Sequence, residues 1–194
     1  MTPDDLATEM DAACLGLPVV DARIALVRRG VPLETLRGPW AVGYTRIETD
    51  GNTYQPCPSG RPAFIIPEPI RANDDWADPD WQILDLVAVT PTAPAEIYTR
   101  RGLAWALGAY NARYAVYSGE PLTVHRTPFA WLRANRQGIA IVDASEMSLH
   151  LSWCSAVIGA DVMHARQLRS QLLPPEIPVP QVLVPNHPEM HAHA

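Results

Sequence analysis

Hydrophobic residues recur every three or four positions at both ends of the chain, which is the spacing of amphipathic helices. The first helix has a Thr-Pro start at Thr2 and a stop at Gly16. A second helix is predicted from about Val19 to Arg29. Its apolar repeat is formed by Val20, Ile24 and Val27. The N-terminal region is therefore expected to be helical.

A longer stripe lies near the middle of the chain. Five apolar or aromatic residues step by four and three between Thr99 and Tyr117, which predicts one helix with a single buried face. They are Leu103, Leu107, Tyr110, Tyr114 and Tyr117. Tyrosines exposed on a groove would instead suit the stacking of nucleic-acid bases.

Between the two helical regions, β-branched and aromatic residues alternate with turn residues. An Asp-Gly pair predicts a tight hairpin over about 41–54. A short strand at 63–66 is closed on both sides by proline. Residues 82–90 are apolar on both faces except at Asp85, so this strand is expected to be central in its sheet.

Strands and helices alternate in the second half. Strands are predicted at 122–125 and 138–142. One helix is predicted to start at Thr127, another at Asp143, and a third helix is predicted over about 160–172. Together with the hairpin, this order predicts an α+β fold with a helical N-terminal region and a small mixed sheet with packed helices.

The length of 194 residues suits a single α+β domain over residues 1–172, followed by a proline-rich tail over 173–194. Six prolines prevent the tail from continuing a helix, so it is expected to run extended. Its first part, about Pro174 to Val184, is rich in Ile, Val and Leu, and is expected to pack in a groove of its own domain or of a partner.

Composition excludes several classes of protein. The apolar runs are too short to span a bilayer, and the N-terminus is acidic where a secretory signal would be basic, so a cytoplasmic protein without a membrane partner is expected. The three cysteines lie far apart and lack the spacing of metal ligands. Neither a structural metal nor a cofactor is predicted.

All 15 basic residues are arginines, and the formal net charge is −6. Eight of these arginines follow residue 98, where acidic residues are few, and two interpretations stay open. Codon bias in a GC-rich genome would replace lysine throughout, whereas a phosphate-binding face would contact nucleic acid. The candidate phosphate-binding residues are Arg100, Arg101, Arg126, Arg133 and Arg136.

Three polar residues that lie in or at the end of predicted strands, Asp85, His125 and Asp143, form a candidate divalent-metal site. Each residue also has a purely structural interpretation. Asp85 would pair with an arginine, His125 would hydrogen-bond to backbone groups, and Asp143 would cap a helix. Neither a nucleophilic-serine motif nor a Gly-rich phosphate loop occurs. Trp76 and Trp81, in an acidic segment, are either a partner-binding knob or residues of an ordinary loop.

Several short segments together resemble an uncharacterised bacterial family associated with phage and other mobile elements. The segments are ILDLVA at 83–88, YTRRGLA at 98–104, ALG at 106–108, VHRTP at 124–128, WLRA at 131–134 and GIAIVD at 138–143. The resemblance covers residues 80–172 and implies an accessory role near mobile-element or prophage replication or regulation. It implies no catalytic residue.

The sequence thus favours a non-enzymatic accessory or interaction protein of a phage-like element. Its expected partner is another protein, and nucleic acid is the second possibility. The alternative function is a small metal-dependent hydrolase or nuclease that uses Asp85, His125 and Asp143. The pattern indicates no oligomeric state.

The tail hypothesis predicts different results for two truncations. Deleting the residues after Asn186 should leave the melting temperature unchanged, because that segment is polar. Deleting from Pro174 should lower the melting temperature, because apolar contacts with the domain are lost. Thermal unfolding followed by circular dichroism measures both. An unchanged value after the longer deletion would argue against docking on the chain's own domain.

Overall fold

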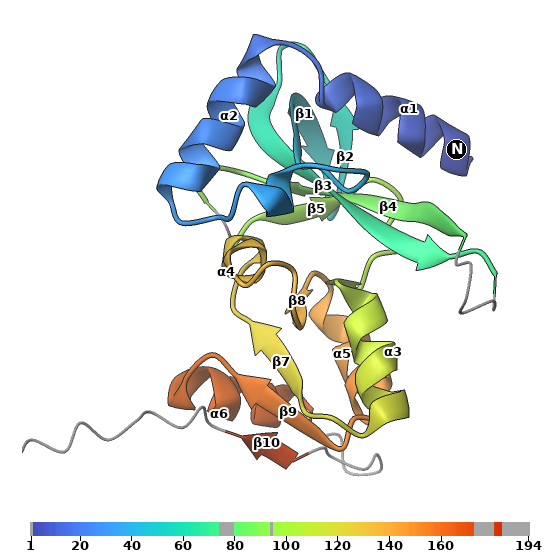
Figure 1. Cartoon of the computed structure of the whole chain (residues 1–194), viewed down its shortest axis with the longest axis vertical. Helices are drawn as coiled ribbons and strands as arrows, with labels where there is room; N and C mark the ends of the chain where they lie inside the picture. Colours follow the sequence, from blue (N-terminus) through green and yellow to red (C-terminus); the bar gives the residue numbers. More distant parts are fainter. Residues whose placement is uncertain (1, 74–79, 94, 173–180, 184–194) are drawn as a thin grey trace, which may run out of the picture.

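The computed structural model describes residues 2–73, 80–93, 95–172 and 181–183. Two helices, a closed barrel and a second sheet follow one another along the chain (Figure 1). This arrangement confirms the α+β class. No helix among the described residues is long and apolar enough to cross a membrane.

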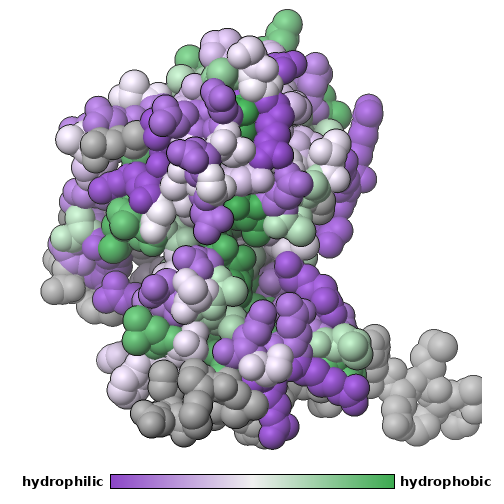
Figure 2. All heavy atoms as spheres, turned by 180° about the vertical axis from the view of Figure 1, so that it is seen from behind, coloured by the Kyte–Doolittle hydropathy of each residue, from purple (hydrophilic) through white to green (hydrophobic). Residues whose placement is uncertain are grey.

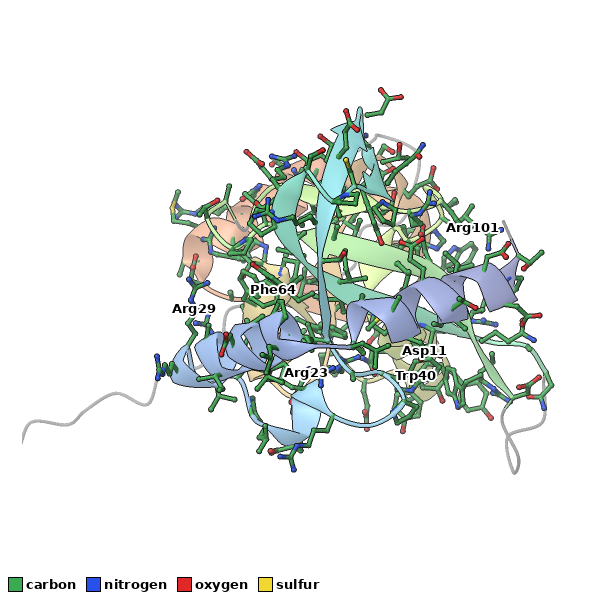
Figure 3. All side chains as sticks on the ribbon, turned by 90° about the horizontal axis from the view of Figure 1, so that it is seen from above. Asp11, Arg23, Arg29, Trp40, Phe64 and Arg101 are labelled. Atoms are coloured by element: carbon green, nitrogen blue, oxygen red, sulfur yellow. The ribbon has the colours of Figure 1, made fainter. Side chains whose placement is uncertain are left out.

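Two helices and a short 3-10 turn precede the barrel. They are α1 (Pro3–Ala13), α2 (Leu17–Arg28) and the turn Glu34–Leu36. The start of α1 is the predicted one, because the Thr2 hydroxyl accepts from the Asp5 N–H and the Asp5 carboxylate accepts from the Thr2 N–H. Both helices lie over the barrel in the view from above (Figure 3).

The packing of α2 corrects the expected apolar repeat. The helix buries Val19, Ala22 and Leu26 against the barrel. Val20, Ile24 and Val27 are exposed instead. The sequence of α2 contains two apolar stripes, and periodicity alone does not show which stripe faces the core.

Five strands close into the barrel in the order β1-β2-β5-β4-β3. Their bounds are β1 (Gly43–Asp50), β2 (Thr53–Pro56), β3 (Arg61–Arg71), β4 (Trp81–Val89) and β5 (Ile97–Thr99). The predicted hairpin is confirmed: Asp50 pairs with Thr53, and Gly51 has the positive φ that its turn requires. The strand containing Asp85 lies between two neighbours, as expected.

Strand β3 is longer than its prolines suggested, because it continues through Pro62, Pro67 and Pro69. It pairs with β1 over residues 61–65 and with β4 over residues 64–71. Each proline therefore lies where β3 has one neighbouring strand, and its missing N–H can face the open side. The boundary expected at these prolines was wrong for this reason.

The second sheet has the order β10-β9-β7-β8-β6. Its strands are β6 (Ala106–Leu107), β7 (Leu122–His125), β8 (Ile139–Ile141), β9 (Ala156–Gly159) and β10 (Gln181–Leu183). Strands β7 to β10 are parallel, and β6 pairs antiparallel with β8. Of the tail, only β10 falls within the described residues, and it pairs in parallel with β9 of the same chain. The docking of the rest of the segment from about Pro174 to Val184 stays a prediction.

Four helices accompany this sheet: α3 (Ala109–Ser118), α4 (Pro128–Arg133), α5 (Ala144–Leu151) and α6 (Val162–Gln171). Residues of α3, α5 and α6 share one hydrophobic cluster with the strands. Helix α4 joins a different cluster, which continues into α2 and the barrel. The large side chains of that cluster include Leu26, Leu36, Phe64, Ile66, Phe129, Trp131 and Leu132.

The prediction of a helix over 99–117 was wrong for the first half of that range. Residues 97–99 form β5, a loop follows, and α3 begins at Ala109. Leu107 is fully buried in β6, whereas Leu103, Tyr114 and Tyr117 are exposed. Helix α3 buries its alanines, Ala112 and Ala115. The helical spacing of the five residues was coincidental, because backbone contacts described below hold residues 100–104 as a loop.

The burial of Leu107 and the exposure of Leu103 predict destabilisation of different size for two alanine variants. Leu107→Ala should lower the free energy of unfolding by about 2–5 kcal/mol, because a cavity remains in the core. Leu103→Ala, at an exposed position of the preceding loop, should have a much smaller effect. Urea unfolding measures both. Equal destabilisation by the two variants would contradict the burial found for the two side chains.

Candidate functional site

A cleft of about 800 Å³ lies between the ends of β3 and β4 and the helices α3 and α5. Four aromatic residues from different parts of the fold line it: Trp81, Trp105, Tyr110 and Trp153. In the view from behind, apolar residues gather at the constriction between the barrel and the second sheet (Figure 2).

Ring contacts fix part of the cleft wall. Trp81 meets Tyr110 edge to face, with 5.1 Å between the ring centroids, and it also meets Trp40 at 6.5 Å. Trp105 stacks on His150 at 4.3 Å, with the two rings nearly parallel. These contacts join the barrel to α3, and the loop before β6 to α5.

Other large apolar side chains of the cleft point into solvent. Trp153 is 74% exposed and Leu149 is 57% exposed, and Leu103, in the loop after β5, is also exposed. Grouped exposed hydrophobic residues of this size typically mark a binding surface. Burial of these side chains by a ligand would remove apolar area from water.

Charged residues of both signs border this apolar surface. Asp143 and Glu146 stand at the start of α5, whereas Arg71 ends β3 and Arg113 lies on α3. Asp143 also caps α5, because its carboxylate accepts from the Ser145 N–H at 2.8 Å. The predicted helix cap is thus confirmed, and Asp143 also lines the cleft.

Glu68 lines the cleft from β3 and is fully buried. Its carboxylate accepts hydrogen bonds from the backbone N–H groups of Gly108 and Ala109, at 2.7 and 2.9 Å, where α3 begins. Burial raises the pKa of Glu68 to about 8, although these N–H groups and Arg136 favour the charged form. Sequence analysis missed this residue. The signal available was an acidic residue between two prolines inside a strand.

Gly108 allows this contact with Glu68. Its φ is +76°, and an added Cβ would lie 2.7 Å from the Gly138 carbonyl oxygen and 2.9 Å from Nε1 of Trp131. Glycine is therefore required at this position, both for its conformation and for space. A larger residue would displace the start of α3 from Glu68.

Asp85 faces Glu68 across the β3–β4 pair, next to a bulge. It is fully buried, and its carboxylate accepts from five backbone N–H groups at 2.7–3.1 Å. The donors are Leu86, Arg100, Arg101, Leu103 and Ala104. This carboxylate therefore organises the loop after β5. The sequence suggested an ion pair between Asp85 and an arginine. Arg100 and Arg101 contact Asp85 through their backbone N–H groups, and their side chains bond elsewhere.

The three candidate metal ligands do not come together. Asp85 is occupied by backbone donors, Asp143 caps α5, and His125 makes a 2.8 Å contact through Nε2 with the Gln137 carbonyl oxygen. Burial lowers the pKa of His125. Within the described ranges, no group of three or more His, Cys, Asp or Glu residues could hold a metal ion.

The candidate phosphate-binding arginines differ in their surroundings. Arg100 pairs with Glu9 at 2.9 Å, Arg126 pairs with Asp161 at 2.7 Å, and Arg136 donates to the carbonyls of Thr35 and Trp40. Arg101 donates to the Leu84 carbonyl at 3.4 Å, and Arg133 is exposed on α4. Figure 3 shows that Arg101 also lies far from Arg29. Intramolecular partners thus hold several of these side chains.

Of the two tryptophans in the acidic segment, Trp76 lies outside the described residues, and Trp81 packs at the cleft. No protein-family model, curated protein or solved structure matches the chain. The resemblance to a mobile-element family therefore remains a prediction.

The raised pKa of Glu68 predicts how stability depends on pH. From about pH 5 to 8 the unfolded chain loses this proton while the folded chain keeps it, so the free energy of unfolding should fall as the pH rises. The contribution is at most about 1.4 kcal/mol per pH unit. Glu68→Gln should flatten this fall.

Urea unfolding across the pH range measures these slopes. Glu48→Gln serves as the control, because Glu48 is exposed on β1. If Glu68→Gln and the unmodified chain gave the same slope between pH 5 and 8, the raised pKa would be wrong.

Proposed function

We propose that this chain is a non-catalytic binding protein whose cleft receives an apolar segment of a partner protein. The observation that carries the proposal is the gathering of Trp81, Trp105, Tyr110 and Trp153 in one cleft with exposed aliphatic side chains. Tryptophan and tyrosine are the residue types that most often dominate the binding energy of protein interfaces.

The exposure of the cleft walls favours a protein segment over a small molecule. Small-molecule sites enclose most of the surface of their ligand. Here Leu149 of α5 and Trp153, two residues beyond the end of α5, stand in solvent on one wall of the cleft. A longer, convex segment would cover these side chains.

The charges around the cleft describe the partner segment. Asp143 and Glu146 would attract a basic residue, and Arg71 and Arg113 would attract an acidic one. We therefore expect an aromatic or aliphatic anchor with flanking charges of both signs. The two carboxylates on α5 would oppose a phosphate backbone, which makes nucleic acid the less favoured ligand.

We further propose that this binding role belongs to a phage-like mobile element in the bacterial cytoplasm. The support is the sequence resemblance of residues 80–172, the part of the chain that contributes α3 and α5 to the cleft. The partner would then be another protein of the same element or of its host.

The proposal predicts which variants lose binding. Peptides selected from a displayed random library on the immobilised chain should bind Trp153→Ala at least about tenfold more weakly, because this exposed ring acts as an anchor. Leu149→Glu should also weaken binding, because it places a charge on the apolar wall. Isothermal titration calorimetry with the selected peptides measures these affinities.

Met163→Ala is the matched control, because Met163 is 65% exposed on α6 and does not line the cleft. All three variants should keep the melting temperature of the unmodified chain. Peptides that bind Trp153→Ala and Leu149→Glu as tightly as the unmodified chain would refute the cleft as the binding site. Salt-sensitive binding of a labelled DNA oligonucleotide, lost in Trp153→Ala, would assign the cleft to nucleic acid.

A further inference from the structure

Helix α2 carries a second apolar stripe, which faces away from the barrel. Leu17 is 80% exposed, Val20 50%, Ile24 45% and Val27 42%. Steps of three, four and three residues are the spacing of the seam between two packed helices. Because Val19, Ala22 and Leu26 already pack on the barrel, α2 is apolar on two opposite sides.

Helix α2 lies at the outside of the molecule (Figure 1), and the exposure of the stripe shows that this side of the helix faces solvent. A helix that packs one apolar side on the core normally carries polar residues on the opposite side, and α2 does not. The exposed Leu33 follows shortly after α2 and extends the apolar surface beyond its end. A partner that covers the stripe would complete the burial of α2.

Charged residues beside the stripe indicate which partner fits. Asp21 and Arg28 are exposed, and because they are seven residues apart they lie on the same flank of α2. Neither makes an ion pair within the described part of the chain. On the other flank, Arg23 turns inward and donates to the Val42 carbonyl and to Sγ of Cys14 (Figure 3).

An antiparallel pairing of two α2 helices about Ile24 satisfies both features. Ile24 then faces its own copy, Val20 faces Val27, and Leu17 approaches Leu33. In the same register, Asp21 of each copy faces Arg28 of the other. In a parallel pairing, opposite flanks of the two helices would face each other, so Asp21 would lie on the side of Arg23, whose guanidinium is already occupied within its own chain.

We propose that a second copy of this chain covers the α2 stripe, and that the chain forms a twofold symmetric dimer through antiparallel α2 helices. Such an interface is self-complementary, because each copy of α2 supplies one acid and one base to the same contact. The proposal is independent of the cleft, which lies between the barrel ends and the helices of the second sheet.

Sedimentation velocity of the full chain over a concentration series tests the dimer. The unmodified chain should sediment as a dimer, and Ile24→Glu as a monomer with an unchanged circular dichroism spectrum. Met163→Glu is the control, because it places the same charge at an exposed apolar position on α6, and it should remain dimeric. A monomer at every concentration, or a dimer unaffected by Ile24→Glu, would overturn the proposal.

Charge reversal tests the antiparallel register. Asp21→Arg and Arg28→Asp should each raise the dimer dissociation constant about tenfold or more, because like charges then face each other twice. The double variant D21R/R28D should restore the dimer, because each new arginine faces a new aspartate. A double variant as weak as either single variant would refute this pairing.

Discussion

Two buried carboxylates on neighbouring barrel strands hold the second half of the molecule in place. Asp85 and Glu68 pair across β4 and β3, and together they accept hydrogen bonds from six backbone N–H groups between residues 100 and 109. These contacts fix the loop after β5 and the start of α3. Without these acceptors, buried donors would lose their partners, which is costly in free energy. The position of the cleft follows from this junction, because its walls are the barrel ends and α3.

Local patterns predicted the elements whose signals lie within a few residues. The Thr2 cap, the hairpin turn at Gly51 and the helix starts at Thr127 and Asp143 all depend on neighbouring backbone groups. The α+β class followed from their order. The loop over 100–104 did not follow, because it depends on the carboxylate of Asp85, at least 15 residues earlier in the chain.

In the candidate site, too, the features that depend on contacts between distant parts of the chain were not predicted. Trp81 and Tyr110 stood out in the sequence, but their contact depends on how the barrel meets α3. Glu68 was missed, because the sequence does not reveal that the start of α3 lies against it. Asp85 was chosen because it lies in a strand expected to be central, and that strand does lie between two neighbours, with Asp85 fully buried. Its role was not predicted, because a buried carboxylate serves equally well as a metal ligand or as an acceptor for backbone donors.

The prolines of β3 have a consequence for the kind of contact that the molecule can make. A strand edge with free N–H and carbonyl groups is a template onto which another chain can add a strand. Pro67 and Pro69 remove donors where β3 extends beyond β1, in the part of the strand that lines the cleft. Aggregation through this edge is thereby disfavoured. A segment entering the cleft would be recognised by its side chains, and its backbone would not continue the sheet.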